Sequence, residues 1–233
     1  MPTTETGTQW WRDSAPELGY WAIDRHLAGF ADWDAVLASG RAELARALPF
    51  LCPGRERTCL DLGCGVGRLT FPLAELFGSV IAVDVSPAFL ALARSHAAGK
   101  NISFRLLQGS ELSPTVIEPL DVVFSYEVFH YLSDSTLRRY LLDARRLMRA
   151  GGELVFEANT QPARRGSEVK REIRRCLNVA GVRRFRGTPT HSGFATVHRS
   201  EADYLRIMAE CGFSGACLTP EAGQQTWFHA TPA

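Results

Sequence analysis

Three glycines at every second position mark the part of this sequence that is best suited to bind a ligand. Gly63, Gly65 and Gly67 follow a short apolar run that contains one acid, Asp61. Glycine adopts positive φ without strain and lets a bound group approach the backbone more closely than a side chain would allow. From Leu69 the apolar residues have helical spacing. The sequence therefore predicts a strand, a glycine turn and a helix whose N-terminal amides face the turn, where a ligand can bind.

The class of ligand follows partly from what the turn lacks. A dinucleotide-binding fingerprint has its third glycine where this chain has Arg68, and no Gly-Lys-Ser/Thr sequence of a phosphate-binding loop is present. A tight structural turn without a ligand is the other interpretation.

An acid at the end of the next apolar run favours a ligand. Asp84 ends the run that begins at Ser79, and it lies 19 residues after Gly65 (84 − 65). A carboxylate at the carboxyl end of a strand is well placed to accept hydrogen bonds from two ribose hydroxyls. The alternative is that Asp84 only caps the helix that follows.

The sequence Asp-Leu-Gly-Cys-Gly-Val-Gly resembles the first motif of the class I S-adenosylmethionine-dependent methyltransferases, and the resemblance covers residues 58–158. It implies that S-adenosylmethionine is the cofactor, with its methionine end at the glycine loop and its ribose at the acid after the next strand. In the family an acid commonly follows the glycine that is Gly109 here and meets the adenine. This chain has Ser110 there and Glu111 one place later, so Ser110 or a backbone amide can make that contact instead. The residues expected at the cofactor are Asp61, Gly63, Cys64, Gly65, Gly67, Asp84, Val85, Ser110, Glu111 and Ser125.

The segment after the buried run 120–125 is expected to border the transferred methyl group, because ligands of open parallel sheets bind at the carboxyl ends of the strands. His130 and Tyr131 are the candidate catalytic residues there. A neutral imidazole can take a proton from a hydroxyl or an amine, and Tyr131 can orient the substrate. Packing in the core is the alternative for both. The chain lacks the Asn/Asp-Pro-Pro-Tyr sequence with which nucleic-acid amino-methyltransferases grip a flipped base.

The elements that position these residues alternate between apolar runs and helical patterns, which predicts an α/β fold. The resembling family has a Rossmann-like, seven-stranded, mostly parallel sheet with helices on both faces and an antiparallel C-terminal hairpin, and we expect the same here. All 233 residues are expected to form one domain. Its expected parts are an N-terminal helical cap (1–52), a cofactor-binding core (58–158), a basic helical insertion or lid (160–199) and a closing helix and hairpin (200–233).

Composition excludes several classes of protein. A chain with 45% hydrophobic residues and a net charge of +1 can bury one sizeable core and has no strong bias toward nucleic acid or membranes. Its six cysteines include no Cys-x-x-Cys pair, which argues against a metal site or a disulfide framework and for a reducing compartment. No apolar run approaches the length of a membrane span. We therefore expect a cytoplasmic protein that binds no metal and no membrane.

Two segments keep open interpretations. Residues 160–199 carry ten basic residues, among them Arg199, and only two acids. They can form a solvated helix face, a lid over an anionic substrate, or a surface for RNA or acidic lipid. Between residues 10 and 33 lie six large aromatic residues, which either anchor the cap on the sheet or wall a substrate pocket; they are Trp10, Trp11, Tyr20, Trp21, Phe30 and Trp33.

The resemblance and these patterns together predict methyl transfer from S-adenosylmethionine to an oxygen or nitrogen of a small-molecule acceptor. Because the segment 160–199 is basic, this acceptor can be an anion. The alternatives are an RNA methyltransferase that uses residues 160–199, a module that binds the cofactor without transferring its methyl group, and an enzyme that uses the sulfonium only electrostatically.

Overall fold

A computed structural model describes residues 32–109, 111–160, 196–218 and 226–233, together with residues 11–12 and short pieces between 172 and 189. Seven strands form one sheet in the order β3-β2-β1-β4-β5-β9-β8. The first five strands pair in parallel, whereas β9 runs antiparallel to both β5 and β8. The strands are β1 (Thr58–Leu62), β2 (Ser79–Asp84), β3 (Ile102–Leu106), β4 (Leu120–Ser125), β5 (Met148–Ala158), β8 (Phe213–Leu218) and β9 (Thr226–Pro232).

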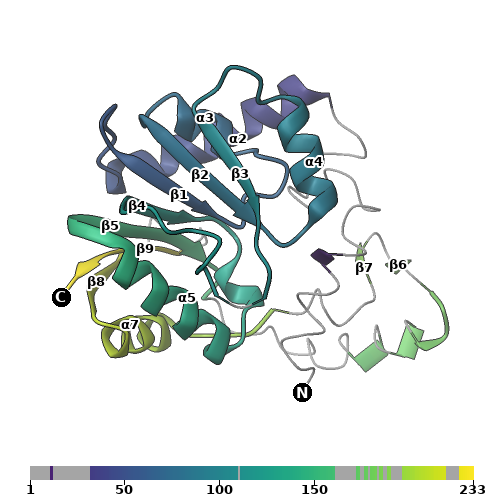
Figure 1. The fold of residues 1–233 in the computed structure, drawn as a ribbon. Coiled ribbons are helices and arrows are strands. Elements are labelled where there is room, and N and C mark those ends of the chain that lie inside the picture. The colour runs from purple at the N-terminus through teal and green to yellow at the C-terminus, as the bar shows by residue number, and fades with distance from the viewer. Residues whose placement is uncertain are drawn as a thin grey trace.

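Helices cover both faces of this sheet (Figure 1). On one face lie α2 (Trp33–Ala47), α3 (Thr70–Ala74) and α4 (Pro87–Ser95), and on the other lie α5 (Asp134–Leu147) and α7 (Glu201–Glu210). Two short 3-10 helices, η2 (Leu48–Phe50) and η3 (Phe129–Tyr131), and a two-residue ribbon of β6 (Arg184–Phe185) and β7 (Thr188–Pro189) complete the described elements. The predicted fold class, including the antiparallel pair at the C-terminus, is confirmed.

The central strands are buried on both faces, which is why their sequences read as nearly continuous apolar runs. Alternate residues of β4 belong to different cores: Val123 joins the cluster beneath α5 and α7, and Val122 and Phe124 join the cluster beneath α2 and α3. The chain crosses from β3 at one edge back to β4 beside β1. Such a reversal in strand order leaves a crevice at the carboxyl ends of the strands.

The helix α2 reaches the glycine turn through a close backbone contact that the sequence did not predict. A Cβ atom on Gly40 would lie 1.9 Å from the carbonyl oxygen of Arg68, so only glycine allows this approach. Trp33, at the start of α2, stacks on His96 with ring centroids 3.9 Å apart and meets Phe71 edge to face. Trp33 therefore anchors α2 on the rest of the domain. Four of the six aromatic residues between residues 10 and 33 lie outside the described residues.

None of the helices in the described part of the chain combines the length and the apolar character that a bilayer-spanning helix requires. The five cysteines that can be described are free thiols, and two of them, Cys52 and Cys176, are exposed.

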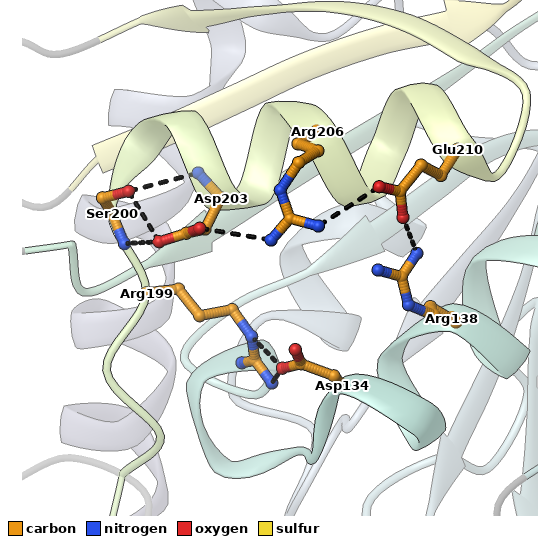
Figure 2. Close-up of polar contacts among 7 residues, drawn as sticks. All are labelled: Asp134, Arg138, Arg199, Ser200, Asp203, Arg206 and Glu210. Atoms are coloured by element: carbon orange, nitrogen blue, oxygen red, sulfur yellow. Dashed lines mark hydrogen bonds and ion pairs between the residues drawn. The ribbon is translucent and has the colours of Figure 1, made fainter.

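Arg199 fastens the segment before α7 to the turn that carries η3 and the start of α5 (Figure 2). Its side chain is 3% exposed. It donates hydrogen bonds to Asp134 Oδ1 at 2.7 and 2.9 Å and to the backbone carbonyls of Phe129 and Leu132 at 3.1 and 2.6 Å. Arg199 is therefore neither part of a solvated helix face nor available to a bound polyanion. The interpretations given above for the basic segment 160–199 do not apply to this residue.

Replacing Arg199 should destabilise the protein much more than replacing an exposed arginine of the same helix region. Arg199→Met leaves buried carbonyls without their donor, so the free energy of unfolding in urea should fall by about 3 kcal/mol. Arg206, whose exposed side chain pairs with Asp203 and Glu210, provides the control, and Arg206→Met should change little. Equal effects of the two substitutions would contradict the anchoring role of Arg199.

Candidate functional site

A pocket opens at the carboxyl ends of β1, β2 and β4. Three chain segments form most of its wall: the glycine turn, the end of β2 and the turn after β4. It is lined by Trp11, Asp61, Leu62, Gly63, Cys64, Gly65, Arg68, Leu69, Val83, Asp84, Val85, Phe89, Leu107, Tyr126, Glu127, Val128, Tyr131, Leu132 and Tyr140.

The glycine turn has the backbone that its sequence predicts. Gly63, Gly65 and Gly67 have φ values of 84°, 55° and 90°. The Gly63 N–H donates to the carbonyl of Val83 at 2.8 Å, which holds the turn against β2. A Cβ on Gly63 would lie 2.2 Å from Val128 Cγ2. Both φ and space therefore require glycine at this position, and the contact places the turn after β4 directly against the glycine turn.

Asp84 joins the glycine turn to the helix that follows β2. Its Oδ2 accepts the Gly65 N–H at 2.9 Å and its Oδ1 accepts the Ser86 N–H at 2.8 Å. Burial raises the pKa of the Asp84 carboxyl, and the backbone donors oppose that rise. The N-cap of α4 is Ser86, whose Oγ accepts the Phe89 N–H. The interpretation of Asp84 as a mere helix cap is therefore wrong, and the carboxylate borders the pocket.

Asp61 lies at the end of β1, is 2% exposed and also borders the pocket. Its Oδ2 accepts a hydrogen bond of 2.6 Å from Thr70 Oγ, the first residue of α3. Burial raises the pKa of Asp61 to about 7, and the nearby charge of Asp84 adds to this rise. The site can therefore hold Asp61 in either charge state near neutral pH, according to what binds beside it.

The turn after β4 forms the opposite wall. Tyr126 donates to Glu43 Oε2 at 2.8 Å, and the guanidinium of Arg68 lies 5.1 Å from the centre of its ring. Glu127, the next residue, has a φ of 55°, and its N–H donates to Glu157 Oε2 at 3.1 Å.

The two candidate catalytic residues take different positions. Tyr131 lines the pocket, and its ring meets that of Trp11 edge to face with centroids 5.2 Å apart. His130 is 5% exposed, lies outside the pocket lining and packs its ring against Tyr131. Their proposed roles stay predictions, and the geometry favours Tyr131 as the one that can reach a substrate.

Several expected cofactor residues lie away from the pocket surface. Ser125 is fully buried, and its hydroxyl donates to the Leu62 carbonyl at 2.9 Å, which joins β4 to β1. Gly67 belongs to the glycine turn and has positive φ, but it does not line the pocket. Glu111 is exposed and lies 3.9 Å from Arg139, and Ser110 lies outside the described residues.

The sequence missed most of the apolar wall on the β2 side of the pocket. Phe89 from α4, Leu107 after β3 and Tyr140 from α5 line it together with Val85. Phe89 has helical spacing and Leu107 ends an apolar run, and such patterns in a single sequence do not distinguish a core residue from a pocket wall. Tyr140 reaches this wall through a contact between distant segments, because its hydroxyl donates to the Gly109 carbonyl at 3.3 Å.

Comparison with known proteins agrees with this geometry. Residues 59–152 match the family model described as a methyltransferase domain. That segment is a class I methyltransferase domain. It contains the glycine turn, Asp84 and the turn after β4, so the family predicted from the first motif is confirmed.

Relatives of this methyltransferase domain include two enzymes named ubiquinone biosynthesis O-methyltransferase. The one from Cereibacter sphaeroides is 34% identical over 124 residues, which are 52% of this chain and 49% of the relative. The one from Azorhizobium caulinodans is 32% identical over 151 residues, which are 64% of this chain and 54% of the relative. The chain thus spans about half the length of the curated relatives that it matches.

A solved structure shares the fold over nearly the whole chain. Magnesium protoporphyrin IX methyltransferase from Synechocystis PCC 6803, with bound S-adenosylhomocysteine, superposes with a TM-score of 0.63 and 19% identity, covering 97% of this chain and 98% of that one.

The raised pKa of Asp61 predicts a pH-dependent stability. The unfolded carboxyl ionises near 3.8 and the folded one near 7, so the folded state binds more protons between these values and its stability falls as pH rises through them. Asp61→Asn removes this dependence. The variant should gain roughly 4 kcal/mol relative to the wild type between pH 4 and pH 8, measured by urea unfolding at each pH. A difference that does not change with pH would contradict the assignment.

Gly63→Ala should destabilise the domain more than Gly151→Ala. Both glycines have positive φ, 84° and 75°, but a Cβ on Gly151 meets nothing within 4 Å. The control therefore reports the backbone strain alone, about 1 kcal/mol. Gly63→Ala adds the collision with Val128 and should cost at least about 2 kcal/mol in total, measured by thermal and urea unfolding. Equal losses would show that the turn after β4 can move away.

Proposed function

We propose that this chain is an S-adenosylmethionine-dependent methyltransferase that modifies an oxygen or nitrogen of a small-molecule acceptor. The observation that carries the proposal is the arrangement of Asp84. Each of its carboxylate oxygens is oriented by one backbone N–H, which leaves a second lone pair on each for the two hydroxyls of a ribose. The same carboxylate fixes the glycine turn of a class I methyltransferase domain.

The charges of the pocket lining fit this cofactor. Asp61, Asp84 and Glu127 line it, against a single arginine, Arg68, among the described lining residues. Such a wall favours a ligand with net positive charge, as the sulfonium and ammonium of S-adenosylmethionine provide. We place the methionine end at the glycine turn and the adenine at the apolar wall described above.

S-adenosylmethionine, when bound, supplies an activated methyl group. The work left to the protein is to hold the acceptor in line with the carbon–sulfur bond, which accounts for most of the acceleration in such a reaction. The turn after β4 is placed for this task because it lies against the glycine turn. Tyr131 and Trp11 form an aromatic wall there that can orient a substrate.

The class of acceptor is carried over from the relatives, whose names refer to ubiquinone biosynthesis and magnesium protoporphyrin IX. We propose a small-molecule acceptor, not RNA, and a single domain acting in the cytoplasm. The lid over an anionic substrate stays a prediction, because the lysine and arginine side chains of residues 160–199 lie outside the described residues apart from Arg199, which is buried.

Calorimetric titration with S-adenosylmethionine and S-adenosylhomocysteine tests the cofactor site. Both should bind the wild type, and Asp84→Asn should bind each about tenfold more weakly, because a charge-assisted pair of hydrogen bonds to the ribose is lost. Asp121→Asn is the control: this carboxylate at the start of β4 accepts the Thr58 N–H and pairs with Arg149, away from the pocket. No binding at millimolar ligand would overturn the proposed function.

A further inference from the structure

Glu127 stands out in the described backbone because it is a non-glycine residue with positive φ, 55°. This conformation costs about 1 kcal/mol or more for a residue with a Cβ and persists only where the surroundings impose it. Glu127 is the second residue after the end of β4 and lines the pocket. Its neighbour Val128 touches the glycine turn. Backbone strain of this kind is concentrated at functional sites.

Glu157, near the end of β5, imposes that conformation. Its side chain is 1% exposed, and its Oε2 accepts the Glu127 N–H at 3.1 Å. Its other oxygen, Oε1, is buried and has no hydrogen-bond partner in the described structure. Burial raises the pKa of the Glu157 carboxyl well above its usual range, and the charge of Glu127 raises it further. A buried carboxyl with an unsatisfied oxygen destabilises the fold, so its presence here is better explained by the turn that it holds.

The third nearby carboxylate, Glu43, has a different task. It pairs with Arg46 at 3.0 Å and accepts the Tyr126 hydroxyl, and it lies outside the pocket lining. The candidate base from the sequence, His130, also lies outside that lining. Among the described residues after β4, Glu127 is therefore the carboxylate that the pocket presents to a bound molecule.

We propose that Glu127 is the catalytic residue that receives the proton of the acceptor, and that Glu157 is the positioning residue that aims it. The proposal rests on the proposed function. The acceptor's hydroxyl or amine donates a hydrogen bond to Glu127, and its lone pair attacks the methyl carbon. The carbon–sulfur bond breaks, its electron pair stays on sulfur to give neutral S-adenosylhomocysteine, and the acceptor's proton passes to the Glu127 carboxylate. The acceptor therefore carries a hydrogen on its reacting oxygen or nitrogen.

Sinefungin tests this geometry without a known acceptor, because it carries an amine at the position of the transferred methyl group, whereas S-adenosylhomocysteine carries nothing there. If Glu127 faces that position, Glu127→Gln should weaken sinefungin binding at least about tenfold and change S-adenosylhomocysteine binding by less than about threefold. Calorimetry of both ligands with the full chain gives the two values. An equal change for both ligands would overturn the proposal.

Two further variants separate positioning from simple support of the fold. The preference is the affinity for sinefungin relative to that for S-adenosylhomocysteine. Glu157→Gln keeps an oxygen that can accept the Glu127 N–H, so this variant should retain most of the wild-type preference. Glu157→Leu should lose the preference while still binding S-adenosylhomocysteine. Glu43→Gln is the matched control and should keep the preference. A Glu157→Leu variant that keeps the preference would overturn the positioning role. If the wild type binds neither ligand, the proposed function itself fails, which is a distinct result.

Discussion

The carboxylate of Asp84 is the constraint on which the rest of the site depends. It bonds at once to the N–H groups of Gly65 and Ser86, so one side chain fixes the glycine turn after β1 and the start of α4 after β2. The strand order places these two strand ends side by side. The carboxylate is partly removed from solvent, and its two hydrogen bonds compensate for this desolvation.

The acceptor side of the pocket is held by contacts from elements that come later in the chain. Ser125 ties β4 to β1, Glu157 on β5 fixes the backbone of Glu127, and Arg199 binds the carbonyls around η3. The Val197 N–H adds a backbone bond of 2.6 Å to the His130 carbonyl. Strand β5 and the segment before α7 thus contribute to the site by orienting the turn after β4, whose residues line the pocket together with Tyr140 of α5.

Local signals in the sequence predicted the cofactor side well. The glycine spacing, the acid after β2 and the alternation of apolar runs each reflect a backbone or strand-end requirement that a single segment satisfies, so the fold and the Asp84 position followed from them. The acceptor side depends on contacts between distant segments. No pattern near Glu127 announces the positive φ that Glu157 imposes thirty residues later (157 − 127). The same holds for Gly40, which must be glycine because its helix lies against the carbonyl of Arg68. It also holds for Arg199, which composition alone grouped with the other basic residues of 160–199.

A crystal structure of the protein with bound S-adenosylhomocysteine would show whether Asp84 holds the ribose. We expect the two ribose hydroxyls to lie within hydrogen-bond distance of the two Asp84 oxygens, with the amino-acid end of the ligand along Gly63 to Gly65 and the sulfur facing the turn that carries Glu127. A ligand bound elsewhere, or bound here with its ribose away from Asp84, would contradict it.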